Sequence, residues 1–289
     1  MNTKINPSPR IQAFRKEIIE ELPRVPLNKG SLASLHLMPT NRLIQAYLTW
    51  KMRLVVPKPR VVKFWVDGVS NSEVRYLKSK LLPFLQKVAA GKDLSSHLSQ
   101  HAKKAGIVLE GASPSNRRKD IDSVLIRQGL HHFHIGSSSP KNPKGRSDFL
   151  IFAEVLEKEF LVVAIASHDA FKAGSKEQLR FLKICNSYIA KDVPIGQGFL
   201  ANPVMSSGHS MTLTLFSDAC SREIEQRDPS LDDPIFINEL YGGQLIMRDG
   251  KIIGKPEKSL MAWSFQDLKF GILDKKTKVF FCIYPFFSR

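Results

Sequence analysis

Polar and apolar residues near the middle of the chain alternate in the way that a strand of a half-buried sheet requires. The run HHFHI at 131–135 places His132 and His134 on one face, because successive side chains of a strand point to opposite faces. Two longer apolar runs follow at 149–155 and 160–166. We expect these three segments to be neighbouring strands of an antiparallel sheet.

Other segments show helical spacing of apolar residues or shorter alternating runs. Helices are predicted at 11–22, 41–53, 73–90, 94–104, 120–128 and 175–190. Strands are predicted at 61–66, 211–216, 245–247, 251–254, 260–265, 269–273 and 279–284. The fold class that follows is α+β, with helices packed on a small antiparallel sheet.

The same pass along the chain predicts three consecutive regions. Residues 1–65 form a basic, helical N-terminal region, residues 66–190 an α+β core, and residues 191–289 a β-rich C-terminal extension.

Spacing also assigns side chains to faces of two predicted helices. In 94–104, His97 and His101 stand four residues apart, but no acidic or cysteine partner is adjacent, so we interpret both as surface histidines. In 175–190 four side chains are expected to face the core: Leu179, Leu182, Cys185 and Ile189.

Charge is distributed unevenly. The net charge is +16, and residues 1–120 contribute 22 Lys and Arg against 8 Asp and Glu, an excess of 14. Such a surface favours a polyanion partner through counterion release, and a solvated basic surface is the alternative. We expect RNA as the partner. The candidate RNA-binding cations are Arg42, Lys51, Arg53, Lys58, Arg60, Lys63, Lys141 and Lys144.

The cysteines and the lengths of the apolar runs indicate the cellular compartment of the protein. The three cysteines are far apart and form no CxxC pair, which argues against a disulfide framework or a structural zinc site. No apolar run reaches the length of a membrane helix, and the N-terminus lacks the apolar segment of a signal peptide. We expect a soluble, cytoplasmic protein with no membrane partner.

The alternating histidines suggest a specific chemistry. If the three central strands are neighbours, His132, His134, Arg146 and His168 converge on one patch. One imidazole can remove a ribose 2′-OH proton, another can protonate the leaving 5′-oxygen, and an arginine can stabilise the phosphorane between them. Histidine suits both roles because its ordinary pKa lies near neutral pH. This chemistry needs no cofactor and no metal.

Four alternatives stay open at this point. Histidines in strands are often structural, and a basic chain of this kind also fits a non-catalytic nucleic-acid-binding regulator. An HxH pair begins the metal site of several amidohydrolases, but only 155 residues follow His134, too few for a (β/α)₈ barrel. Arg127 and His132 have the R-x4-H spacing of HEPN ribonucleases, in which the motif lies on a helix, whereas Gly129 favours a strand here.

The run HHFHIG, GRSDFLIFAEV, FLVVAIASHDAFK and KEQLRFLKI resembles the YafO-type mRNA interferase toxins of bacterial toxin–antitoxin systems, best over 127–190. The resemblance implies a RelE-like α+β core and a basic endoribonuclease that cuts mRNA, often on the ribosome, and is restrained by an antitoxin. It implies site roles for His132, His134, Arg146 and His168. This chain is much longer than such toxins, in both its basic N-terminal third and its last hundred residues.

Overall fold

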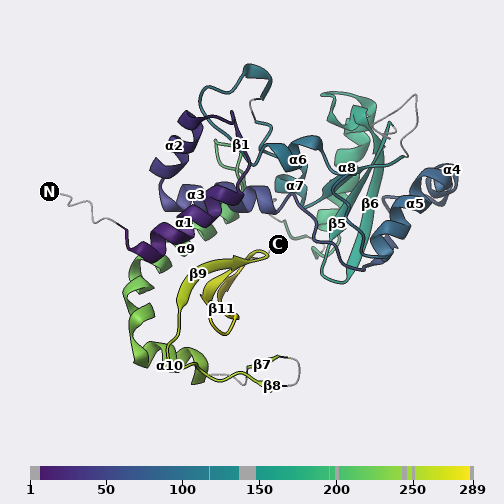
Figure 1. Ribbon diagram of the computed structural model, residues 1–289. Helices are drawn as coiled ribbons and strands as arrows, with labels where there is room; N and C mark the ends of the chain where they lie inside the picture. The colour runs from purple at the N-terminus through teal and green to yellow at the C-terminus, as the bar shows by residue number, and fades with distance from the viewer. Residues whose placement is uncertain are drawn as a thin grey trace. The chain divides into compact units, whose positions relative to one another are not determined.

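The computed structural model describes residues 7–116, 118–136, 148–194, 196–198, 202–242, 246–248 and 251–286. The chain divides into two compact units, each assembled from separated segments (Figure 1). Unit 1 comprises Met1–Lys51, Gly106–Arg117 and Thr212–Arg289, and unit 2 comprises Met52–Ala105 and Arg118–Met211. The chain therefore leaves and re-enters each unit, a division that differs from the three consecutive regions expected from composition.

Unit 2 is a helix-on-sheet structure. Its four-stranded sheet has the order β2-β6-β5-β4, in which β2 pairs with β6 in parallel and the other pairs are antiparallel. The predicted antiparallel arrangement of the three central strands is confirmed. The elements are β2 (Val61–Phe64), α4 (Asn71–Tyr76), α5 (Lys78–Ala89), α6 (Gln100–Lys104), α7 (Ser123–Gln128), β4 (His131–His134), β5 (Phe149–Val155), β6 (Glu159–Ser167), the 3-10 helix η2 (His168–Phe171) and α8 (Lys176–Ala190).

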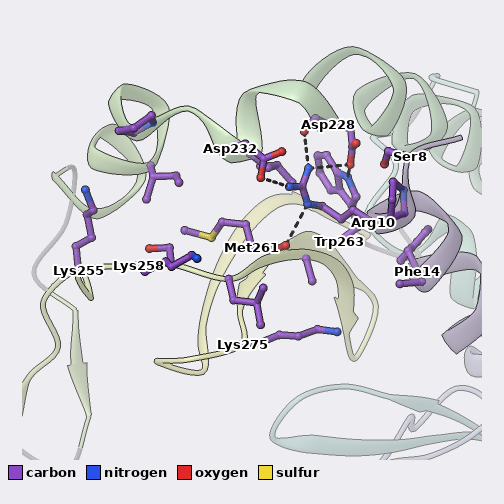
Figure 2. Close-up of a pocket in the computed structure, with 18 of the residues that line it drawn as sticks. Ser8, Arg10, Phe14, Asp228, Asp232, Lys255, Lys258, Met261, Trp263 and Lys275 are labelled. Carbon is purple, nitrogen blue, oxygen red and sulfur yellow. Dashed lines mark hydrogen bonds and ion pairs between the residues drawn. The ribbon is translucent and has the colours of Figure 1, made fainter.

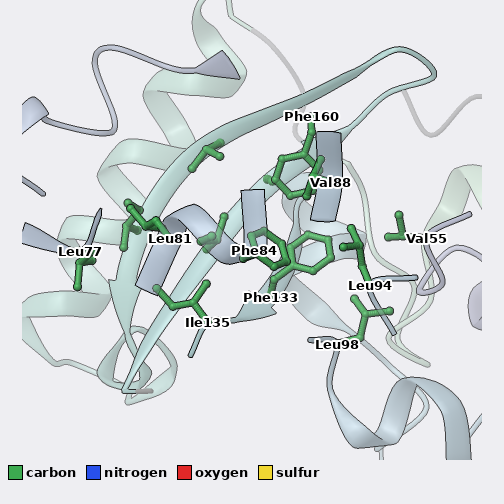
Figure 3. Close-up of a cluster of buried hydrophobic side chains, with 14 of the residues drawn as sticks. Val55, Leu77, Leu81, Phe84, Val88, Leu94, Leu98, Phe133, Ile135 and Phe160 are labelled. Carbon is green, nitrogen blue, oxygen red and sulfur yellow. The ribbon is translucent and has the colours of Figure 1, made fainter. Parts of the chain in front are cut away.

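Helices cover both faces of this sheet, with α5 and α8 lying on opposite sides of β5 and β6 in Figure 1. On the α5 face, Phe84 packs against Phe133 and Phe160 with ring centroids 5.3 and 5.8 Å apart (Figure 3). On the other face, Phe152 of β5 packs 4.1 Å from the ring of Phe181 on α8. Both faces of the sheet are buried, so both faces of β5 and β6 need apolar side chains. This explains the two longer apolar runs in the sequence.

The predicted helix 73–90 is divided into α4 and α5. Ser70 begins α4 as the N-cap of a capping box with Glu73. At Leu77 the backbone leaves helical geometry (φ −96°, ψ 6°), and this side chain is buried in the core. The apolar spacing continues across the break, so periodicity alone does not reveal it.

The predicted face of the helix at 175–190 needs correction. On α8 the buried residues are Phe181, Cys185 and Tyr188, whereas Leu179 and Leu182 are exposed. The two aromatic rings fill the space above the sheet better than the leucines, and this rotates the helix away from the predicted face.

Unit 1 contains a three-stranded antiparallel sheet of order β11-β10-β9 and a short parallel pair, β1 with β3. A further two-stranded pair joins β7 and β8. The elements are α1 (Pro9–Glu21), β1 (Arg24–Val25), α2 (Lys29–Leu37), α3 (Thr40–Lys51), β3 (Ile107–Val108), η1 (Pro114–Asn116), α9 (Met211–Arg227), η3 (Asp228–Asp232), α10 (Pro234–Gly242), β7 (Met247–Arg248), β8 (Lys251–Ile252), β9 (Met261–Gln266), β10 (Lys269–Asp274) and β11 (Val279–Pro285).

The prediction of a strand at 211–216 is wrong, because these residues begin the helix α9. Leu213, Ser217, Cys220 and Ile224 are buried along one side of α9 at helical spacing. The short alternation of Met211–Phe216 fits either structure, and the helical period becomes visible only when the following residues are included. The C-terminal region therefore contains helices as well as the predicted strands.

Arg10 joins three elements of unit 1 beside a cavity of about 610 Å³ (Figure 2). Its guanidinium donates to the carbonyl oxygens of Met261 at 3.1 Å and Asp228 at 2.6 Å, and to Oδ1 of Asp232 at 2.5 Å. Asp228 in turn accepts from Nε1 of Trp263 at 2.8 Å. Arg10 is thus a structural cross-link between α1, η3 and β9. No helix in the described part of the chain is long and apolar enough to span a membrane.

Candidate functional site

Strand β4 presents two imidazoles side by side on the α8 face of the unit 2 sheet. In the pairing with β5, His132 lies opposite Phe152 and His134 lies opposite Leu150. Both partners belong to the apolar cluster beneath α8. The ring centroids of His132 and His134 are 6.2 Å apart. The alternation in the sequence correctly places these two rings on one face.

A third predicted histidine joins them from the end of β6. The ring centroid of His168 lies 5.2 Å from that of His134. The backbone N–H of His168 donates to the carbonyl oxygen of Asp148 at 3.1 Å, which holds the end of β6 against the start of β5. The structure therefore brings His132, His134 and His168 together. Arg146, the fourth predicted residue, lies outside the described residues.

Asp122 is a site residue that the sequence analysis missed. Its Oδ2 lies 3.3 Å from Nδ1 of His132, and its Oδ1 accepts from the backbone N–H groups of Val124 and Leu125 at 3.2 and 3.1 Å as the N-cap of α7. Gly129 ends α7 in the left-handed conformation (φ 69°, ψ 15°), and the chain turns there into β4. A cap residue ten positions before a histidine carries no sequence signal of this contact.

The electrostatics of Asp122 favour its ionised form. Burial acts to raise the pKa of this carboxyl, but the contact with His132 and the helix-terminal N–H groups outweigh burial and place the pKa below its usual range. Asp122 is therefore an anion at neutral pH, and it attracts a proton to the nearest nitrogen of His132.

The contacts at Nδ1 determine which nitrogen of each ring is available for chemistry. The carboxylate at 3.3 Å favours a proton on Nδ1 of His132. The carbonyl oxygen of Asp148 lies 3.1 Å from Nδ1 of His168, and since a carbonyl only accepts, Nδ1 of His168 carries a proton too. In both rings Nε2 is then the nitrogen left to take up or give away a proton.

The three rings differ in their access to solvent. His168 is exposed, the His132 side chain is 15% exposed, and His134 is buried. Phe171, at the end of η2, and His132 form a T-shaped ring pair with centroids 5.4 Å apart, and Phe171 is itself exposed. The cluster thus lies at the surface of the sheet edge, with one ring open to solvent and two behind it.

The other two histidines of this region have structural roles. His131 points to the opposite face, where its Nε2 donates to the carbonyl oxygen of Met52 at 2.9 Å and burial lowers its pKa to about 4. His97, predicted to be a surface histidine, is buried. Its Nδ1 donates to the carbonyl oxygen of His134 at 2.8 Å, and its Nε2 accepts from Nζ of Lys87 at 3.0 Å. His97 therefore braces the outer edge of β4.

Two of the predicted RNA-binding cations are buried. Arg53 donates to the carbonyl oxygens of His101 at 2.6 Å, Ala105 at 2.9 Å and Lys119 at 3.3 Å. Arg60 donates to those of Leu156 at 2.8 Å, Val56 at 3.0 Å and Lys58 at 3.3 Å. Because both guanidiniums are engaged by the backbone, their geometry argues for a structural role and against contact with phosphate.

The remaining predicted cations are nearer the surface. Arg42 and Lys63 are exposed, and Lys63 forms an ion pair with Glu159 at 2.5 Å. Lys51 is half-buried, pairs with Glu21 and lies over the ring of Trp50. Lys58 is half-buried and pairs with Glu157. Lys141 and Lys144 lie outside the described residues.

Neither known proteins nor metal-binding geometry assign a function to this cluster. No family model, curated protein or solved structure matches the chain. Among the described residues, no group of three or more His, Cys, Asp or Glu side chains has a geometry that could hold a metal ion.

Proposed function

We propose that the protein is a metal-independent endoribonuclease of toxin or phage-defence type that cleaves RNA by attack of the ribose 2′-OH. The observation that supports this most is the pairing of Nδ1 of His132 with Asp122 and of Nδ1 of His168 with the Asp148 carbonyl. This arrangement leaves two imidazoles of one cluster with Nε2 as the exchanging nitrogen, as an acid–base pair requires.

In the proposed reaction His132 is the general base. Its Nε2 takes the 2′-OH proton, the 2′-oxygen bonds to phosphorus, and the bond from phosphorus to the 5′-oxygen breaks. His168 gives a proton to that 5′-oxygen. Asp122 favours the base role of His132 because an anion at Nδ1 stabilises the imidazolium that forms. The products are a 2′,3′-cyclic phosphate and a 5′-hydroxyl.

His134 and Arg146 complete the proposal. The ring of His134 is within 5.2 Å of His168 and 6.2 Å of His132, centroid to centroid, and this buried ring is proposed to support the base and the acid from behind. Arg146 is proposed to stabilise the negative phosphorane.

The substrate class follows from charge and chemistry. An attacking 2′-OH restricts the reaction to RNA, and the excess of 14 positive charges in residues 1–120 favours a polyanion. We further propose that unit 2 is a RelE-like core that acts on mRNA, on or off the ribosome, and that an antitoxin or inhibitor protein restrains it.

The test is cleavage of a 5′-labelled RNA oligonucleotide by purified protein with EDTA present. Wild type is expected to cut and to leave 2′,3′-cyclic phosphate ends, and His132→Ala is expected to lose at least 100-fold in rate. His36→Ala is the matched control, because His36 is an exposed histidine of unit 1. Salt-sensitive binding without cleavage indicates a non-catalytic nucleic-acid-binding protein. Cleavage that EDTA abolishes, with 5′-phosphate ends, indicates a metal-dependent nuclease.

A further inference from the structure

Phe171 is an exposed aromatic ring beside the histidine cluster. Its side chain is 47% exposed, although the free energy of burying a phenylalanine side chain is strongly favourable. One side of the ring is used within the fold, where it meets the His132 ring at 5.4 Å in an edge arrangement and the Phe152 ring at 6.0 Å. Solvent reaches the rest of the side chain.

The segment that carries Phe171 is held in place from both ends. Ser167 caps η2 by accepting from the N–H of Asp169 at 3.3 Å. The carbonyl oxygen of Asp169 accepts from Oγ of Ser175 at 2.6 Å and from the N–H of Lys172 at 3.0 Å, and Ala170 is buried against the sheet. An exposed aromatic ring on a braced turn is preorganised to receive a flat partner, because little conformational entropy remains to be lost.

We propose that Phe171 is a stacking platform for one unpaired nucleobase of single-stranded RNA, next to the phosphate that the histidines cleave. This inference rests on the proposed function. Stacking on an aromatic side chain is how proteins hold single-stranded nucleic acid without reading its sequence, because every base has a π face. The base that stacks here is beside His132, so the ribose 2′-OH is brought close to the proposed general base. Bases inside a duplex are already stacked on one another, which restricts the platform to unpaired RNA.

A simpler role for Phe171 is to cover His132 and Phe152 from water. The two roles are separated by substitution: Phe171→Leu keeps an apolar cover and removes the ring, whereas Phe171→Trp keeps a ring. Tyr76→Ala is the matched control, because Tyr76 is an exposed aromatic of unit 2 for which the described residues show no ring contact with the histidines.

The experiment measures binding of a fluorescent, fully 2′-O-methylated RNA oligonucleotide, which this mechanism cannot cleave, together with cleavage of the unmodified oligonucleotide. Phe171→Leu and Phe171→Ala are expected to weaken binding of the single strand by about 5- to 100-fold, with Phe171→Trp and Tyr76→Ala within about 2-fold of wild type. Far-UV circular dichroism verifies that each variant is folded.

If Phe171→Leu binds and cleaves like wild type, or if duplex RNA loses as much affinity as the single strand, the stacking platform is ruled out while the ribonuclease stands. If wild type neither binds nor cleaves single-stranded RNA, the proposed function fails, and the inference fails with it.

Discussion

Nδ1 of His132 lies 3.3 Å from Oδ2 of Asp122, so that the cap of helix α7 is also the partner of an imidazole in the candidate site. One oxygen of this carboxylate holds the helix and the other faces the ring. The carboxylate at this distance favours a proton on Nδ1 of His132 and leaves Nε2 to exchange protons. One side chain is thus both the cap of α7 and the charged neighbour of His132.

Because the two roles of Asp122 use different properties, one substitution separates them. Asparagine caps helices about as well as aspartate, but it has no negative charge with which to stabilise an imidazolium. We expect Asp122→Asn to change the free energy of unfolding by less than about 1 kcal/mol and to lower the RNA cleavage rate by about 100-fold. Urea unfolding and single-turnover cleavage measure the two effects. A variant that cleaves at the wild-type rate contradicts the role given to Asp122.

Because Arg53 is buried, its substitution is expected to change the free energy of unfolding, whereas substitution of an exposed phosphate-binding cation is not. A lysine ammonium at this position cannot reach three carbonyl oxygens at once, so Arg53→Lys is expected to lower the free energy of unfolding by about 2 to 3 kcal/mol. Arg42→Lys, at an exposed position, is the matched control and is expected to change it by less than about 0.5 kcal/mol. Equal stabilities of the two variants in denaturant titrations argue against the structural role of Arg53.

His131 makes the stability of the protein depend on pH. Burial lowers the pKa of this imidazole from 6.5 to about 4, so between these values the unfolded chain binds more protons than the folded chain. Stability contributed by neutral His131 is complete above about pH 6.5, falls as pH drops toward 4, and is then level. The loss over this window is on the order of 3 kcal/mol.

The variant His131→Gln tests this directly, because the glutamine amide can still donate to the Met52 carbonyl but does not titrate. We expect its free energy of unfolding to change less between pH 7 and pH 4.5 than that of wild type. A pH dependence identical to that of wild type shows that His131 is not the source.

The sequence correctly predicts the features that depend on the local periodicity of polar and apolar residues. His132 and His134 are two residues apart in a strand, and two-residue alternation is enough to place them on one face. His168 could be expected near them because short antiparallel connections bring consecutive strands together. Periodicity does not predict the element where a short run fits both a strand and a helix, as at Met211–Phe216. It does not predict the buried face of a helix where larger rings compete for the core, as Phe181 and Tyr188 do on α8.

Contacts between segments that are distant in the sequence could not be predicted from the sequence. Nothing in the residue types distinguishes Arg53 or Arg60, which donate to buried carbonyl oxygens, from the exposed Arg42. The pairing of Asp122 with His132 depends on the turn at Gly129, and the ring of Phe171 meets His132 because η2 follows β6. These relationships follow from the tertiary fold, which composition and spacing do not specify.

The most direct test of the proposed mechanism is to remove the attacking oxygen from the substrate. We propose mapping the cleaved bond in a short RNA and repeating the reaction, with EDTA present, on the same RNA with a single 2′-deoxyribose on the 5′ side of that bond. Because the 2′-OH is the proposed nucleophile, cleavage at this bond is expected to disappear while cleavage at other bonds continues. Continued cleavage of the 2′-deoxy bond at the original rate would contradict 2′-OH attack and with it the roles given to His132 and His168.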